Sequence, residues 1–367
     1  MKNYLNLILL IVFMSCQSSK EIEIKKTPFF VGTYTNEESK GIYKYEIDDK
    51  GLLTKVGLQT EIENPSYLRK TSNGKIVLAV SEVDENGTGF ISSYKIEPDS
   101  LKLINTSKTG GAHPCFVEVN GKNQVLVANY TGGNIGLLTL NNDGELSNLL
   151  NVQQHTGKGT TPRQEAPHAH STWFHPNKED IISIDLGTNQ LWFSKIDKSE
   201  NKLVYTKQKT LNMDEGAGPR HLSFHPNKKW IYVLNELNNT ISLVKELDES
   251  YSISSTISML PEGFSEYSKG ADIHISNDGK FLYASNRGHN SIAIFKVNQQ
   301  GGVLELVGFE DVRGANPRNF SLSPDNKFLL VANQDSNNII CFSRDVITGK
   351  LTFINEINAP NPVCILF

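Results

Sequence analysis

Leu126-Val127-Ala128-Asn129-Tyr130 is a short apolar run that ends in a small residue and an asparagine, and variants of it recur along the chain. The other copies are Leu78–Glu82, Ile182–Leu186, Tyr232–Glu236, Tyr283–Arg287 and Leu330–Gln334. Short turns rich in Asn, Asp, Gly and Pro precede these runs, as in Asn277-Asp278-Gly279-Lys280. These residues adopt the backbone conformations of tight hairpin turns. Each copy therefore predicts a buried strand that directly follows a hairpin turn.

The strands around each copy form a longer repeat. A further apolar strand follows the copy, and the examples are Gly136–Leu140, Gln190–Ser194, Ile241–Val244, Ile292–Phe295 and Ile339–Phe342. The strand before it opens near Pro65, Pro114, His168, Pro219, Ala271 and Pro317, at intervals of about 50 residues. A four-stranded unit of this length is typical of a propeller blade.

The two ends of the repeat region complete one another. Residues 29–57 supply only three strands and lack the opening one, whereas Asn361–Phe367 supplies a single strand at the far end. Joining them removes the open edges that a partial ring would expose. The sequence thus predicts an all-β, seven-bladed β-propeller of four-stranded blades, closed by the C-terminal strand in blade one. No linker interrupts it, so residues 28–367 are expected to form a single domain.

The first sixteen residues differ from the rest. Lys2 is the only early charge, Leu5–Met14 is almost wholly apolar, and Ser15-Cys16 follows. This is the pattern of a secretory signal, too short to span a bilayer comfortably. It resembles a bacterial lipoprotein signal, which implies a signal peptide at 1–16, lipidation of Cys16 and a tether at 17–27. An ordinary signal peptide with an incidental cysteine is the alternative. We expect an exported protein that meets the membrane only through its lipid anchor, in the inner or the outer membrane.

Composition excludes several classes of partner. Hydrophobic residues make up 38% of the 367 residues. The formal net charge is −4, so the sequence has no excess of basic residues for binding nucleic acid. Cys115, Cys341 and Cys364 lie in apolar runs without metal-ligand spacing and are expected to be buried as free thiols. We expect a monomer that needs no cofactor.

Polar residues recur where blade strands meet one mouth of the channel. In a propeller blade the innermost strand begins, and the second strand ends, on the same face. The starts contribute His168, Ala169, His170, Arg220, His221, Asp272, His274, Arg318 and Asn319, and the ends contribute Glu82, Tyr130, Asp185, Glu236 and Arg287. Arginines bind carboxylates or phosphates, and they stabilise an oxyanion. A histidine or glutamate can activate water. The set predicts chemistry on an acid or ester.

Structural roles compete with this interpretation. The repeated Asn129, Asn235, Asn286 and Asn333 are expected to brace turns, as is Asp185 in the same position, whereas His175 and His225 fall in turns of the opposite face. His221 and His274 could pack between blades. Glu236, Arg220, Arg287 and His170 form either a site or mutual salt bridges around a water-filled channel, because buried charge is costly without a partner. His168-Ala169-His170 presents two imidazoles but no third or fourth metal ligand, so no metal is expected.

The sequence resembles the lactonase family of seven-bladed propellers, of the bacterial 6-phosphogluconolactonase type. The resemblance spans residues 29–367 and is most specific in 163–171, 185–187, 216–222, 235–236, 281–288 and 317–320. It implies a metal-independent site, and fungal carboxy-muconate lactonizing enzymes belong to the same family. On the family pattern His170, Glu236, Arg220 and Arg287 are the catalytic candidates. Arg163, Gln164 and His168 are expected at the rim, with Arg318, as substrate-binding residues.

The implied reaction is hydrolysis of a sugar-acid lactone. Arg220 and Arg287 would hold the anionic group and the oxyanion, and either Glu236 or His170 would take a proton from the attacking water. The expected export conflicts with a phosphorylated substrate made in the cytoplasm, so an unphosphorylated or carboxylated lactone stays open. A lactonizing enzyme and an exported binding or scaffold propeller without turnover are the alternatives.

Overall fold

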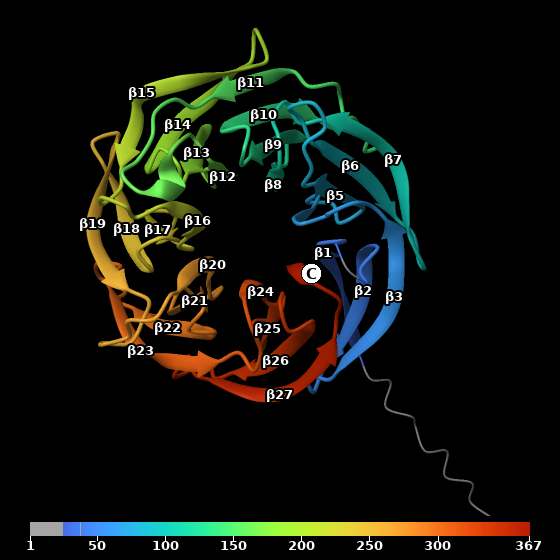
Figure 1. Ribbon diagram of the computed structural model, residues 1–367, viewed down its shortest axis with the longest axis vertical. Helices are drawn as coiled ribbons and strands as arrows, with labels where there is room; N and C mark the ends of the chain where they lie inside the picture. The colour runs from blue at the N-terminus through green and yellow to red at the C-terminus, as the bar shows by residue number, and fades with distance from the viewer. Residues whose placement is uncertain (1–24, 37) are drawn as a thin grey trace, which may run out of the picture.

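The computed structural model describes residues 25–36 and 38–367, and its strands form seven sheets of four. Figure 1 shows these sheets as blades around a central axis. The innermost strand is the first in chain order in blades two to seven, and the C-terminal strand in blade one. The predicted all-β, seven-bladed fold with four-stranded blades is confirmed. The expected signal peptide at 1–16 and its Cys16 lie outside the described residues.

The strands are given from the axis outward. Blade one contains β28 (Pro362–Leu366), β1 (Lys26–Thr33), β2 (Gly41–Asp48) and β3 (Leu53–Glu61). Blade two contains β4 (Leu68–Lys70), β5 (Ile76–Ser81), β6 (Phe90–Ile96) and β7 (Leu101–Lys108). Blade three contains β8 (Pro114–Val119), β9 (Gln124–Asn129), β10 (Asn134–Thr139) and β11 (Asn151–Gln154). Blade four contains β12 (Ala169–Phe174), β13 (Asp180–Asp185), β14 (Gln190–Asp197) and β15 (Lys202–Asn212).

The remaining blades follow the same order. Blade five contains β16 (Pro219–Phe224), β17 (Trp230–Asn235), β18 (Thr240–Leu247) and β19 (Ser250–Ser258). Blade six contains β20 (Lys269–Ile275), β21 (Phe281–Arg287), β22 (Ser291–Val297) and β23 (Leu304–Asp311). Blade seven contains β24 (Pro317–Leu322), β25 (Phe328–Asn333), β26 (Asn338–Arg344) and β27 (Leu351–Asn358). Within the described part of the chain the one helical element is the 3₁₀ turn η1 (Pro162–Gln164), and no helix there is long and apolar enough to cross a membrane.

The C-terminal strand closes the ring as expected. β28 pairs antiparallel with β1, with Val31 opposite Ile365 and Gly32 opposite Cys364. β1 itself begins at Lys26, which lies opposite Asp48 of β2. The last two residues of the tether predicted at 17–27 are therefore part of blade one, because their backbones continue the β1–β2 ladder.

The core lies between blades rather than along the axis. Phe29 and Tyr45 of blade one pack with Leu330 and Ile339 of blade seven, and a comparable cluster occupies each of the seven blade interfaces. Central strands such as β9 and β25 are buried on both faces and read as continuous apolar runs, whereas the outer β19 alternates. Because these interfaces hold the apolar side chains, the innermost strands can present polar groups to the axis.

The repeated asparagines brace the loops, as predicted. Asn129, Asn286 and Asn333 are fully buried, and each donates its side-chain amide to a backbone carbonyl of the preceding inter-blade loop. Asn235 donates instead to Thr240 Oγ1. On the opposite face, His225 Nε2 lies 3.1 Å from the carbonyl oxygen of Gly279, which agrees with a structural role for this turn histidine.

Candidate active site

A single buried carboxylate gathers three guanidinium groups at the mouth of the channel. Glu236 directly follows β17, and its Oε2 lies 2.9 Å from Arg287 Nη2 and 3.2 Å from Arg220 Nε. Its Oε1 lies 3.4 Å from Arg163 Nη2. Glu236, Arg220 and Arg287 are 3%, 3% and 7% exposed. Three of the four predicted catalytic residues therefore form one ion-pair cluster, the Glu236 cluster.

β-Bulges aim the side chains of the innermost strands into the mouth. The pairing register shifts between Ala169 and Ser171, between Pro219 and His221, and between Pro317 and Asn319. The extra residues at these shifts are His170, Arg220 and Arg318. A bulge breaks the strict alternation of a strand and redirects one side chain, which is why bulges are common beside active sites.

The positive charges of the arginines offset the free-energy cost of burying the ionised Glu236 carboxylate. Burial alone would raise the pKa of this carboxyl, but the charges of Arg287, Arg220 and Arg163 lower its pKa to about 2. Burial, together with the nearby Arg287 and Arg318, lowers the pKa of Arg220 to about 10. Both groups are ionised at neutral pH. One carboxylate thus faces three positive charges, and an anion would complete the balance.

His170 adds a neutral imidazole to the mouth. Its side chain is buried, and Nδ1 lies 3.7 Å from Cys115 Sγ. Burial and the positive charges of Arg220 and Arg318 lower its pKa well below the usual range. The ring is therefore neutral at neutral pH, and Nε2 makes no hydrogen bond with any described residue. A neutral imidazole with a free nitrogen can accept a proton.

A second polar group lies across the mouth. Arg318 Nη2 donates to Tyr34 Oη at 2.7 Å, and the Tyr34 hydroxyl donates to Glu82 Oε2 at 2.9 Å. Arg318 also stacks its guanidinium over the Tyr34 ring, 5.1 Å from the centroid. Burial raises the pKa of Tyr34 above its usual range, so this phenol is neutral. Arg318 contributes a further fixed positive charge at the mouth.

The loop before β12 carries the predicted rim residues, and one of them is placed differently. Arg163 is half exposed and also donates to Tyr130 Oη at 2.9 Å, while His168 stacks on the Tyr130 ring at 4.5 Å. The expectation that Gln164 lines the rim is corrected, because this side chain is fully buried behind the loop. Its amide donates to the Leu186 carbonyl at 2.9 Å and to Asn189 Oδ1 at 3.1 Å, so it holds the loop in place.

Other candidates from the sequence brace the channel wall. Asp185 is fully buried and accepts hydrogen bonds from the backbone N–H groups of His168 and Thr188. Asp272 lies 2.8 Å from His221 Nδ1 and 3.0 Å from His274 Nε2. His221 therefore joins blade five to blade six, and His274, which shares β20 with Asp272, packs edge-on against Phe320 of blade seven at 4.9 Å. Packing between blades was one of the roles that the sequence left open. His168 and His170 have different partners, and within 25–36 and 38–367 no three potential metal ligands gather.

Sequence reasoning missed two residues at the mouth. Tyr34 follows Thr33 at the end of β1, the position that Glu82 and Glu236 occupy in their blades. The repeat therefore carried a signal for Tyr34. This signal is hard to recognise, because the innermost strand of blade one does not precede this segment in the sequence. Lys269 begins β20 two residues before the expected opening of blade six. The bulge between Gly270 and Ile273 hides this start from a simple repeat alignment.

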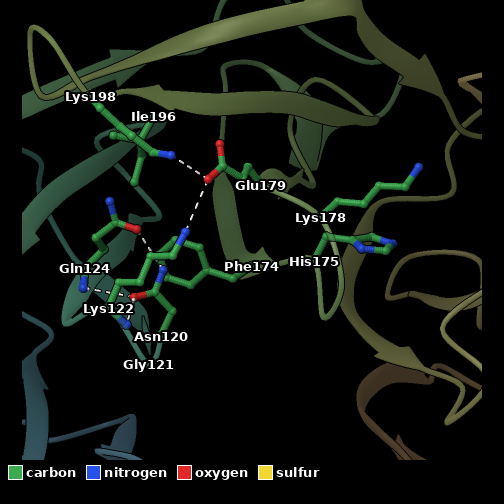
Figure 2. Close-up of a pocket in the computed structure, with 10 residues that line it drawn as sticks. All are labelled: Asn120, Gly121, Lys122, Gln124, Phe174, His175, Lys178, Glu179, Ile196 and Lys198. Carbon is green, nitrogen blue, oxygen red and sulfur yellow. Dashed lines mark hydrogen bonds and ion pairs between the residues drawn. The ribbon is translucent and has the colours of Figure 1, made fainter.

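The opposite face holds a different kind of hollow. A pocket of about 270 Å³ lies between blades three and four, where the β8–β9 and β12–β13 turns meet. Figure 2 shows the side chains that line it. Lys122 and Lys198 both pair with Glu179 there, at 3.2 and 2.6 Å. Lys122, Lys198 and Glu179 are well exposed, so water screens these charges. None of the predicted site residues lines this pocket, so the candidate site stays at the mouth that holds Glu236.

The fold and the site together define a propeller whose channel mouth holds more positive than negative charge and can therefore bind an anion. Residues 28–367 match the family described as "Lactonase, 7-bladed beta-propeller". The chain therefore belongs to the lactonase family of seven-bladed β-propellers.

Similar proteins carry names from this family. The chain is 36% identical over 345 residues to the 6-phosphogluconolactonase of Bacillus subtilis, covering 92% of this chain and 97% of that protein. It is also 36% identical to the 6-phosphogluconolactonase of Formosa agariphila, over 88% of this chain and 94% of that one. Among solved structures, the periplasmic gluconolactonase PpgL of Pseudomonas aeruginosa superposes with a TM-score of 0.88 at 28% identity, covering 93% and 98% of the two chains.

Proposed function

We propose that this protein hydrolyses a sugar-acid lactone at the channel mouth without a metal ion. The observation that carries the proposal is the Glu236 cluster beside the neutral imidazole of His170. Such a site supplies what ester hydrolysis requires, namely fixed positive charge where an oxyanion develops and a group that accepts a proton from water. Relatives named 6-phosphogluconolactonase and gluconolactonase support the same reaction class.

Arg220 and Arg287 are the groups that we assign to the oxyanion. Both are buried and both are oriented by Glu236, so their positions are set before the substrate arrives. Fixed donors in a buried site stabilise developing charge without having to reorganise. Each arginine also donates to a backbone carbonyl of β20, Arg287 to Gly270 at 2.8 Å and Arg220 to Ala271.

We assign His170 as the base. The oxygens of Glu236 are taken by guanidinium groups, and a carboxyl whose pKa is about 2 holds a proton poorly. The pKa of His170 is lowered first by burial and then by Arg220 and Arg318. An anionic substrate beside these arginines offsets their charges, which raises the pKa of His170 toward the value that suits proton transfer.

The bond changes follow from this assignment. Water attacks the lactone carbonyl while His170 takes its proton, and the carbonyl oxygen becomes an oxyanion beside the arginines. The oxyanion then collapses, the bond from the carbonyl carbon to the ring oxygen breaks, and the ring oxygen receives the proton from the His170 imidazolium. The product is an open hydroxy acid, which ionises at neutral pH and releases one proton.

Hydrolysis of a lactone panel tests the proposal. The panel contains 6-phosphogluconolactone, gluconolactone and a carboxymuconolactone, each corrected for spontaneous opening by proton release in a pH-stat. Turnover above background on a member establishes a lactonase and names its substrate class. Saturable binding of the corresponding acids with no turnover on any member would overturn the proposal in favour of a binding propeller. Ring closure of carboxymuconate would favour the lactonizing direction.

We also propose that the protein is exported as a lipid-anchored monomer. The signal-like residues 1–16 with Cys16 motivate the anchor, and a relative titled a periplasmic gluconolactonase supports export. Detergent phase separation of the full-length protein from a bacterial host tests this. Wild-type protein in the detergent phase and Cys16→Ser protein in the aqueous phase is the expected result. Equal partitioning of the two would contradict the anchor.

A further inference from the structure

A small cleft opens from the Glu236 cluster between blades six and seven. It has a volume of about 250 Å³ and is lined by Tyr267, Lys269, Arg287, Asn290, Asn316 and Asp335, with Gly288 and Ala315. Arg287 lines this cleft and also contacts Glu236. A ligand whose reacting group lies at the Glu236 cluster can therefore extend into the cleft. The volume is below that of a typical small-molecule pocket, which suits one end of a ligand.

Lys269 is the unpaired charge of this cleft. Its side chain is half-buried and makes no ion pair or hydrogen bond with any described residue. Nζ lies over the Tyr267 ring, 5.7 Å from the centroid. Burial lowers the pKa of Lys269, and the nearby Arg287 adds to this effect. A partly desolvated ammonium group beside other cations costs folding free energy, which a bound anion would recover.

The walls of the cleft are set by the backbone. Asn290 Oδ1 accepts the N–H of Gly288 at 3.2 Å and the N–H of Asn316 at 3.0 Å, and so ties a blade-six loop to a blade-seven loop. Gly288 has φ of +115°, and a Cβ atom there would lie 2.2 Å from the Tyr267 carbonyl oxygen. Hydrogen bonds and close backbone packing therefore hold the loops that form the walls of the cleft. The cleft is part of the fold.

The balance of charge favours an anion as the occupant. Lys269 and Arg287 are the cations among the lining residues, and Asp335 is the carboxylate. Asp335 Oδ1 accepts a hydrogen bond from Asn316 Nδ2 at 3.0 Å, which partly satisfies it. Arg287 contacts Glu236 directly, whereas Lys269 makes no ion pair among the described residues and feels the charge of Glu236 only at longer range. An anionic group that reaches the cleft would meet an ammonium group that no carboxylate of the described residues contacts.

We infer that Lys269 determines specificity for lactones that carry a second anionic group, a phosphate or a carboxylate, at the end remote from the reacting carbonyl. The inference rests on the proposed lactonase function and deepens it. The lactone carbonyl lies at Arg220 and Arg287, and the remote anion lies in the cleft against Lys269. A neutral lactone uses only the first of these contacts.

The test compares Lys269→Met with wild-type protein on three lactones: 6-phosphogluconolactone, a glucaric acid lactone with a free carboxylate, and neutral gluconolactone. Loss of one charge-assisted contact lowers kcat/KM by about 10- to 100-fold. We expect this loss for the anionic lactones, and a smaller change for gluconolactone. Dependence on Lys269 for only one of the anionic lactones identifies the remote anion. Lys269→Arg should keep most of the preference.

Lys70→Met is the matched control. Lys70 is also a half-buried lysine of an innermost strand that lies over an aromatic ring, Phe30 at 5.7 Å, but it sits at the opposite end of the channel. Lys70→Met should leave the hydrolysis rates of all three lactones unchanged. An equal loss on charged and neutral lactones in Lys269→Met, or no loss on any, would overturn the inference.

Product binding separates this inference from the proposed function. Calorimetry with 6-phosphogluconate, glucarate and gluconate needs no turnover. If wild-type protein hydrolyses none of the lactones, the proposed function fails. A weaker binding of 6-phosphogluconate or glucarate in Lys269→Met, by about 10-fold or more relative to gluconate, still supports the subsite. Identical affinities in both proteins reject it.

Discussion

Glu236 and His170 lie in the same channel mouth but differ in charge at neutral pH. Glu236 is ionised and held by arginines, whereas His170 is neutral with one free ring nitrogen. Two ionisable groups with environments this different suit different tasks. The division assigns proton transfer to the imidazole and orientation of the arginines to the carboxylate.

The first prediction separates these roles by substitution. His170→Asn should lower kcat by about 10²- to 10⁴-fold, the usual contribution of a general base. Glu236→Gln should lower kcat less and should also destabilise the fold, because it leaves buried guanidinium groups without a counterion. Steady-state kinetics and thermal unfolding of both variants make the comparison.

His175→Asn is the control, since His175 is equally buried but lies in a turn of the opposite face. It should leave kcat unchanged. A near-wild-type kcat in His170→Asn together with a larger loss in Glu236→Gln would reverse the assignment of the base.

The second prediction concerns pH. An ordinary histidine has a pKa near 6.5 and would lose its basic form below that pH. Burial and the neighbouring arginines lower the pKa of His170, so its neutral form persists to more acidic pH. We expect kcat/KM, corrected for spontaneous hydrolysis, to stay flat from about pH 8 down to below about pH 6. A decline centred near pH 6.5 would show a histidine with an ordinary pKa in control.

At the scale of single residues, much of the channel mouth was predictable from the sequence. His170, Arg220, Glu236 and Arg287 fall at strand starts and ends, and these positions converge in any propeller. The partners of each residue were not predictable, because β-bulges and the path of the long loop set them. Gln164 shows the limit: it adjoins Arg163 in the sequence, yet one side chain reaches the mouth and the other is buried.

At the scale of the blade, Asp272 of blade six links the two neighbouring blades, five and seven. It accepts from His221 of blade five, and from Asn319 Nδ2 of blade seven at 2.5 Å. Asn319 Oδ1 in turn accepts the N–H of Ile365 in blade one at 2.7 Å. The apolar clusters hold each blade to the next, and these polar contacts connect blades five, six, seven and one along the channel wall.

The third prediction tests Asp272 as a structural centre. Asp272→Asn should lower the free energy of unfolding by about 2 to 4 kcal/mol, because it leaves buried donors short of an acceptor. Burial alone would raise the pKa of Asp272, but His274 and His221 hold it well below its usual range. A depressed carboxyl pKa stabilises the fold above the unfolded value near 4, and that stability is lost as pH falls. The difference between wild type and variant should therefore shrink below about pH 4.

Urea unfolding at several pH values measures this difference. Asp143→Asn, an exposed turn aspartate, is the control and should stay within about 0.5 kcal/mol of wild type. If Asp272→Asn behaved like the control at neutral pH, the polar contacts of Asp272 would contribute nothing to the ring. The strands of each blade were predictable from the repeat, but these polar contacts were not, since they depend on the bulged register of blades five, six and seven.

At the scale of the whole molecule, the blades form a closed ring, as Figure 1 shows. Seven similar apolar interfaces join them. Closure was predictable from the missing strand at one end of the sequence and the extra strand at the other. β28 joins β1 by backbone hydrogen bonds and packs Cys364 and Ile365 into the interfaces on either side. The last strand therefore contributes to two of the apolar clusters.

The fourth prediction follows from this closure. Removing residues 361–367 should abolish cooperative unfolding and lower soluble yield, because it exposes the edge of β1 and opens two interfaces. A circular permutant that places these residues before Lys26 through a short linker should recover both properties. Calorimetry of the three proteins makes the comparison. A truncated chain that melts like wild type would show that the ring does not depend on β28.

The measurement that tests the central claim most directly is lactone hydrolysis by wild-type protein, Arg220→Met and His175→Asn in parallel. Arg220 contacts Glu236 in the mouth, and His175 lies on the opposite face. Wild type and His175→Asn should hydrolyse the same lactone at similar rates above background, whereas Arg220→Met should lose at least about 100-fold, as expected for loss of an oxyanion contact. Equal rates in all three proteins, or no hydrolysis by any, would contradict a lactonase site at the channel mouth.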